Sequence, residues 1–135
     1  MRHTFYGFLL AIAMLLSLVA PAFAHHALQA EYDTTKRGAF TGTLTKFALI
    51  NPHVRWYFDV KNTDGSITKW EVTGAGAGPL RQSGTSRIFK VGDTYKVTYA
   101  PARDGSHLGR VVNFTFEDGR VVTLFHEDPN NPNDN

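Results

Sequence analysis

The sequence predicts an all-β protein with one short helix, closed into a small antiparallel barrel of five or six strands. Short segments rich in Thr, Val and aromatic residues alternate apolar and polar positions, and Gly, Asp, Asn or Pro fills the gaps between them. Only one short stretch carries helix signals, with Pro79 at its start and Gly84 at its end. Cysteine is absent, so core packing rather than disulfide bonding must stabilise the fold.

The first two predicted strands cover residues 40–50 and 54–60. The apolar positions of the first strand change phase after Leu44, which predicts a bulge or a sharp bend. Asn51-Pro52 supplies the turn between the strands, because proline fixes φ and has no N–H to add to a ladder. The second strand is expected to bury one face, made of Val54, Trp56, Phe58 and Val60. Its outward face is expected to carry His53, Arg55, Tyr57 and Asp59.

Four further strands follow the same alternation: 67–73, 94–100, 109–116 and 121–125. Asp118-Gly119 is a strong two-residue hairpin signal between the last two of them. Three strands, a short helix and two more strands is the element order of the OB barrel, here with a sixth strand added. A small β-sandwich is the alternative architecture.

Residues 1–24 read as a secretion signal, with an apolar run over 5–19 and the small-x-small cleavage site Ala22-Phe23-Ala24. The run is short for a membrane span, which needs about 20 apolar residues, so no anchor is expected after cleavage. Residues 25–126 are predicted to form a single OB-like domain, and the polar stretch 127–135 a disordered tail. We expect a bacterial protein that is periplasmic or secreted.

Composition and motifs argue against nucleic-acid binding and against catalysis. One of the 14 basic residues, Arg2, lies in the leader, so the remaining ones nearly balance the 12 acidic residues and form no basic surface. There is no cysteine nucleophile and no nucleophile-elbow serine, and most acidic residues stand in turns beside glycine. The stretch Gly74 to Gly78 lacks the residues of a phosphate loop and is expected to be a flexible approach to the helix. We therefore predict a protein that is not an enzyme.

Cleavage after Ala24 would place His25 at the new amino terminus, followed by His26. An amino-terminal histidine offers a metal its α-amine and its ring nitrogen, and one further imidazole completes a T-shaped copper(II) site. This arrangement resembles the histidine brace of some exported copper proteins. His53 or His26 is the candidate partner, and Asp33 is a candidate oxygen ligand. The alternatives are a frayed polar terminus at 25–26 and, for His53, a hydrogen bond to the turn or to the first strand.

The outward stripe of His53, Arg55 and Tyr57 supports a second hypothesis. OB barrels commonly bind ligands on such a face, so the stripe is a candidate surface for an envelope protein, a glycan or another small ligand. The sequence thus leaves two functions open, a small non-enzymatic copper-binding module and a metal-independent interaction module.

The chain also resembles an uncharacterised family, a domain of unknown function, of small exported bacterial proteins. The matching features are His25-His26, Glu31-Tyr32-Asp33, Gly42, Asn51-Pro52-His53, Lys90-Val91-Gly92-Asp93, Pro101 and Asp104-Gly105. His25-His26 and Asn51-Pro52-His53 are the most specific of them, and the glycine-rich stretch 74–78 departs from the pattern. The resemblance implies export and the fold, and it implies no mechanism.

Overall fold

The structure is a computed structural model that describes Tyr6 and residues 30–124. The chain divides into two compact units, Met1–Glu31 and Tyr32–Asn135, and the second holds the barrel. Apart from Tyr6, the predicted leader lies outside the described residues, and so do His25, His26 and the predicted tail. Among the described residues, no helix has the length and the apolar character needed to cross a membrane.

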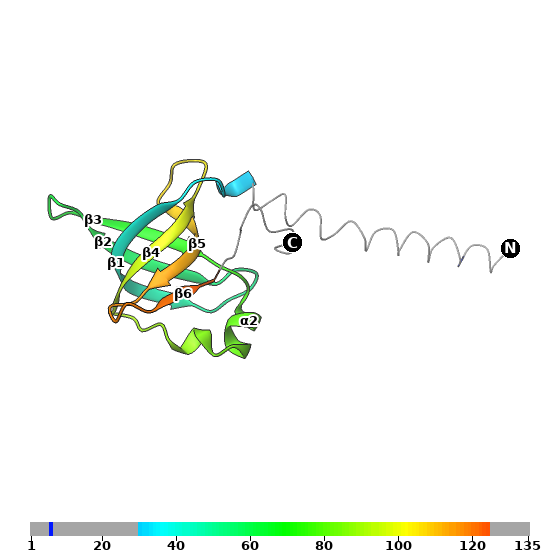
Figure 1. The fold of residues 1–135 in the computed structure, drawn as a ribbon. Coiled ribbons are helices and arrows are strands. Elements are labelled where there is room, and N and C mark those ends of the chain that lie inside the picture. The colour runs from blue at the N-terminus through cyan, green and yellow to red at the C-terminus, as the bar shows by residue number, and fades with distance from the viewer. Residues whose placement is uncertain (1–5, 7–29, 125–135) are drawn as a thin grey trace. The chain divides into compact units, whose positions relative to one another are not determined.

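Six strands and one short helix form the described part of the barrel unit (Figure 1). The strands are β1 (Gly38–Ala48), β2 (Arg55–Lys61), β3 (Ile67–Thr73), β4 (Thr94–Pro101), β5 (Leu108–Thr115) and β6 (Val121–Thr123). Helix α2 (Ala77–Gln82) lies between β3 and β4 and is followed by the 3₁₀ turn η1 (Thr85–Arg87). The predicted fold class is confirmed. The helix begins two residues before Pro79, and the sequence did not predict the 3₁₀ turn.

The barrel closes through one parallel strand pair. The strands are ordered β3-β2-β1-β4-β5-β6, and β3 also pairs with β5. In that pair Glu71–Thr73 runs parallel to Leu108–Arg110, whereas the other pairs are antiparallel. The prediction of a wholly antiparallel barrel is therefore wrong at this pair, because α2 and β4 form a crossover that returns the chain in the direction of β3. Closure excludes the sandwich alternative, and among the described strands β6 pairs only with the end of β5.

The bend predicted in the first strand is present. The register of β1 against β2 shifts between Leu44 and Lys46, the signature of a bulge. A Cβ at Gly42 would lie 3.0 Å from a methyl of Val60 and 3.1 Å from the carbonyl oxygen of Asp59. The absence of that Cβ lets β1 curve closely over β2, as barrel closure requires.

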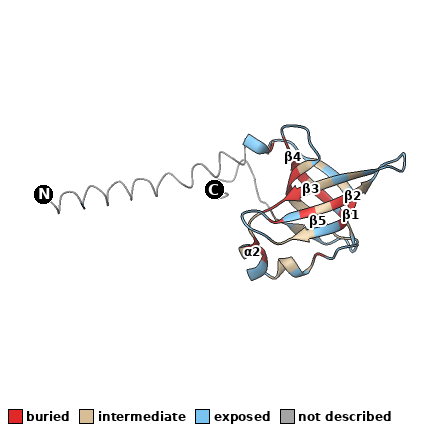
Figure 2. Cartoon of the chain, turned by 180° about the vertical axis from the view of Figure 1, so that it is seen from behind, coloured by how far each residue is buried: buried red, intermediate tan, exposed pale blue. Residues whose placement is uncertain are grey.

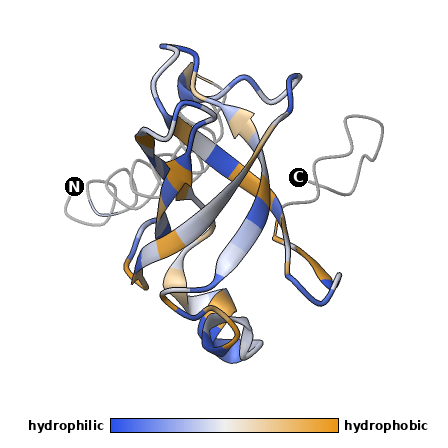
Figure 3. Cartoon of the chain, turned by 90° about the vertical axis from the view of Figure 1, so that its left-hand side faces the viewer, coloured by the Kyte–Doolittle hydropathy of each residue, from blue (hydrophilic) through white to orange (hydrophobic). Residues whose placement is uncertain are grey.

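Hydrophobic and hydrophilic residues are interspersed along the strands (Figure 3), and the strands carry many of the buried residues (Figure 2). Alternate side chains of a strand point to opposite faces, so one set forms the core. The predicted inward residues Val54, Trp56 and Phe58 are at most 1% exposed, while Val60 is half-buried. Aromatic rings fill much of the interior, and Phe114 contacts both Trp56 and Phe58. Burial of such rings removes a large apolar area from water, so the core stabilises the barrel without disulfides.

Candidate functional site

The loop between β1 and β2 packs against the segment that joins β3 to α2. Backbone hydrogen bonds run from Val54 N to the Ala75 oxygen (3.0 Å) and from Gly74 N to the Val54 oxygen (2.9 Å). Arg81 on α2 donates to the Leu49 oxygen over 3.2 Å. These bonds fix the predicted Asn51-Pro52-His53 turn against α2 at one end of the barrel.

His53 is exposed, and its ring is held by a backbone carbonyl. Its Nδ1 lies 3.1 Å from the carbonyl oxygen of Gly74. A carbonyl oxygen only accepts hydrogen bonds, so Nδ1 carries the proton and donates it. The other ring nitrogen, Nε2, then holds the lone pair of the neutral imidazole. The alternative role foreseen for His53, a backbone hydrogen bond, is thus present, although its partner follows β3 and does not belong to the turn or to β1.

Two glycines of the glycine-rich segment 74–78, Gly74 and Gly76, pack closely against neighbouring residues. A Cβ at Gly74 would lie 2.8 Å from Cζ3 of Trp56, and a Cβ at Gly76 would lie 3.1 Å from Oδ1 of Asn51. The N–H groups of Gly74 and Ala77 already donate to the Val54 oxygen and to Asn51 Oδ1. Those donors are therefore engaged within the barrel, which agrees with the exclusion of a phosphate loop.

The outward face of β2 carries Arg55 and Tyr57 as predicted, and both side chains already contact neighbours. Arg55 donates to Glu71 on β3 over 2.7 Å, and the Glu71 carboxylate raises the pKa of Arg55. The ammonium of Lys46 on β1 lies 5.2 Å from the centre of the Tyr57 ring. The charge of Arg55 is thus balanced locally, and the Tyr57 ring is partly covered.

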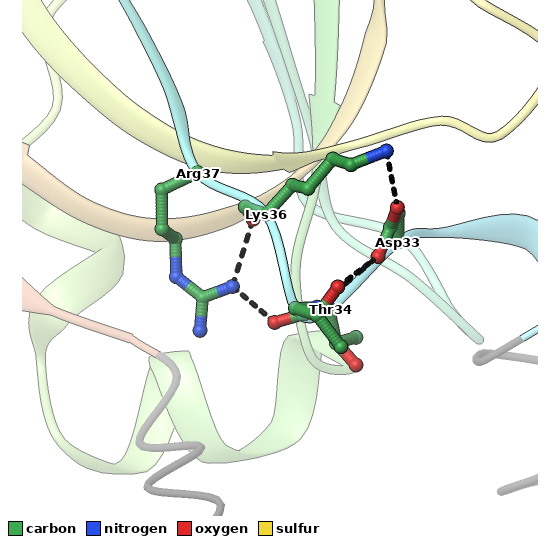
Figure 4. Close-up of polar contacts among 5 residues, drawn as sticks. Asp33, Thr34, Lys36 and Arg37 are labelled. Atoms are coloured by element: carbon green, nitrogen blue, oxygen red, sulfur yellow. Dashed lines mark hydrogen bonds and ion pairs between the residues drawn. The ribbon is translucent and has the colours of Figure 1, made fainter.

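Asp33, the candidate oxygen ligand, lies in a turn that uses both its carboxylate oxygens (Figure 4). Oδ1 accepts from the hydroxyl of Thr35 over 2.6 Å, and Oδ2 pairs with Lys36 over 3.1 Å. Arg37 donates to the carbonyl oxygens of Thr34 and Lys36, which closes the turn. The Thr35 hydrogen bond, followed by the contact with Lys36, lowers the pKa of Asp33 to about 2.

Within residues 30–124, no group of three or more His, Cys, Asp or Glu side chains converges to hold a metal ion. Of the four predicted metal ligands, the structure places only Asp33 and His53, and both have partners of their own. Tyr32, directly before Asp33, reaches the strand end beside His53, because its hydroxyl lies 3.1 Å from Oγ1 of Thr73. A site that includes His53 therefore needs ligands beyond the described residues.

Residues 12–111 match a protein family described as a family of unknown function, DUF6152. The chain belongs to this family. The match covers most of the barrel and confirms the resemblance to an uncharacterised family. No curated protein and no solved structure matches the chain. Family membership therefore supplies no activity, and the proposal below rests on the residues of this chain.

Proposed function

We propose that this protein is an exported, non-enzymatic barrel module that binds copper(II) through its mature amino terminus and His53. The amine and ring of His25 would chelate the ion after cleavage behind Ala24, and His53 would add the third nitrogen. Copper(II) heads the divalent affinity order and favours such tetragonal nitrogen ligation. In the periplasm or outside the cell, the module would sequester or carry the ion.

The contact between His53 Nδ1 and the Gly74 carbonyl oxygen is the observation that carries the proposal. Histidine ligands in metal sites almost always donate their second ring nitrogen to a carbonyl or carboxylate, which fixes the tautomer and the ring orientation. The bond of His53 Nδ1 to the Gly74 oxygen is of this kind, and it leaves Nε2 as the ligand atom on an exposed side chain. This contact supports the proposal that His53 contributes one nitrogen ligand.

The proposal requires the amino terminus to reach His53 from Tyr32, the first residue of the barrel unit. The Tyr32 hydroxyl contacts the side chain of Thr73. Thr73 directly precedes Gly74, whose carbonyl oxygen contacts His53. His25 lies seven positions before Tyr32, and an extended chain of that length spans at most about 25 Å. Asp33 is left out of the proposed ligand set, because Thr35 and Lys36 already occupy its oxygens.

The metal-independent alternative, an envelope protein or glycan on the face of Arg55 and Tyr57, ranks second. An arginine that recognises an anion needs free guanidinium N–H groups to donate to it. Arg55 already donates to the Glu71 carboxylate. Exchanging one carboxylate for another on an exposed guanidinium gains little affinity.

The first test is the intact mass of the protein exported by a bacterium, since the chelate requires a chain that starts at His25. The second is a competition titration with copper(II), comparing the mature protein, a version with one extra alanine before His25, and His53→Ala. Loss of a group that only hydrogen-bonds a metal ligand already weakens metal binding by roughly tenfold or more. Each of these changes affects a proposed ligand itself, so we expect each to weaken copper binding by at least about tenfold. His107→Ala is the matched control, because His107 is also an exposed barrel histidine.

The pH dependence provides an independent check. The α-amine must lose its proton to bind, so affinity should fall as pH drops below the ordinary α-amine pKa of about 8. A mature chain that starts elsewhere, or equal affinity in the extended version, would refute the amino-terminal chelate. If Arg55→Ala and Tyr57→Ala release a captured envelope component while copper binding is absent, the alternative function is supported instead.

A further inference from the structure

The geometry points to Asn51 as a positioning residue for His53. Oδ1 of Asn51 accepts a hydrogen bond from the backbone N–H of Ala77 over 3.0 Å. Ala77 is the first residue of α2, where N–H groups have no partner within the helix. Gly76 precedes it without a side-chain cap, so Asn51 supplies from the neighbouring loop the acceptor that a capping residue normally provides.

The absence of a side chain at Gly76 makes this contact close. A Cβ there would lie 3.1 Å from Asn51 Oδ1 and 3.3 Å from the carbonyl oxygen of Pro52. Contacts of that length require one partner to shift. Glycine at 76 thus lets the two segments approach until the Asn51 side chain meets the backbone of Ala77.

The Asn51 contact fixes the carbonyl that holds the imidazole. Gly74 is bonded to Val54 on one side, and Asn51 holds Ala77 three residues further along. The backbone between these two points therefore has little freedom, and the Gly74 oxygen is aimed at His53 Nδ1. Asn51 and His53 are two residues apart on the same loop. A shift of Asn51 relative to Ala77 should therefore also shift His53 relative to the Gly74 carbonyl.

Asn51 therefore acts on His53 through the Gly74 carbonyl. Its role is to keep the imidazole in the Nδ1–H tautomer with Nε2 outward. This assignment concerns the ring itself and can be tested without metal. Its consequence for copper affinity rests on the proposed function.

The test is ¹⁵N NMR of the His53 imidazole in the full mature protein, combined with thermal unfolding and copper titration. In the wild-type protein we expect one predominant tautomer with the proton on Nδ1. Asn51→Ala should bring the second tautomer into exchange and weaken copper binding by about tenfold, the lower end of outer-shell effects. Asn51→Asp keeps an acceptor oxygen and should restore the wild-type ring signals.

Asn62→Ala is the matched control. The Asn62 amide donates to Ser66 and Thr68 in the β2–β3 hairpin, so its loss removes exposed hydrogen bonds at the opposite end of β2 from His53. If Asn51→Ala prevents folding, Gly76→Ala provides the second variant, because its new Cβ presses on Asn51 Oδ1.

The outcomes separate the two claims. Lower stability of Asn51→Ala with unchanged His53 signals would show a merely structural role and overturn the inference. A shifted tautomer in a protein that binds no copper would support the positioning role and refute the proposed function. Copper affinity that depends on His53 but not on Asn51 would support the function and overturn the positioning role.

Discussion

Adding one methyl group at Gly74 should destabilise the barrel strongly, because the site has no room for it. The new Cβ would lie 2.8 Å from Cζ3 and 3.0 Å from Cη2 of Trp56. Carbon atoms in good contact are about 3.5–4.0 Å apart, so the methyl intrudes by about 0.5–1 Å. Trp56 is fully buried and contacts Phe47 and Phe89, so its ring cannot withdraw without disturbing the core.

We expect Gly74→Ala to lower the free energy of unfolding by about 1–3 kcal/mol, the usual cost of overpacking. For a domain of this size each kcal/mol lowers Tm by roughly 4–8 °C. The measurement is urea and thermal unfolding followed by circular dichroism. Tryptophan fluorescence should also change, since Trp56 is the residue displaced.

Gly78→Ala is the matched control, since it introduces the same methyl four residues later. No atom lies within 4 Å of the Cβ position at Gly78, and the residue belongs to α2. The gain expected for alanine in a helix is opposed here by Pro79, which disfavours the helical conformation of a preceding residue that carries a Cβ, so Gly78→Ala should change stability by less than about 1 kcal/mol. If Gly74→Ala is as stable as the wild-type protein, or if Gly78→Ala destabilises the barrel as much as Gly74→Ala does, the packing argument is wrong.

Three other predictions concern single side chains. Tyr95→Phe should cost about 1–3 kcal/mol in urea unfolding, because the Lys90 N–H loses the hydroxyl that accepts from it over 2.9 Å. Burial raises the pKa of Tyr95, so its contribution to stability is fully present below the unfolded-state tyrosine pKa of about 10. That contribution should be lost as pH rises further, which unfolding measured at increasing alkaline pH should show. Hydrogen bonds lower the pKa of Asp33 to about 2, so the stability from its turn should be present above pH 4 and lost as pH falls toward 2, a dependence that Asp33→Asn should abolish. Arg55→Ala should cost no more than about 1 kcal/mol, and a double-mutant cycle with Glu71→Ala should give a coupling in the same range, because the ion pair is exposed.

The strands were predictable because each buries one face, and period-two alternation is visible in a single sequence. The phase change after Leu44 even indicated the bulge, since a bulge moves every later side chain to the other face. Turns such as Asp118-Gly119 were equally clear, and Asp118 Oδ1 indeed accepts from the Arg120 N–H. The parallel pair of β3 and β5 was not predictable, because closure depends on which strand ends meet after the crossover.

The candidate site was predictable as a set of residue types and not as a set of contacts. Asn51-Pro52-His53 was recognised as a motif, but its partners lie more than twenty positions later, at Gly74 and Ala77. Both partners are backbone groups, which every residue carries, so no side-chain pattern indicates them. The excess of glycine over 74–78 was the one available signal of a close approach.

The motif and the glycine-rich segment are best understood as one unit. Read separately, the glycines suggest a flexible approach to a helix, and the histidine suggests a solvated turn residue. In the structure, the missing side chain of Gly74 leaves room for Trp56, and the Gly74 carbonyl oxygen contacts His53. The missing side chain of Gly76 likewise leaves room for Asn51. An interaction module of the alternative kind would need only an exposed stripe on β2. The constraints converge instead on one exposed imidazole, and this agrees with the proposed role of His53 as a ligand.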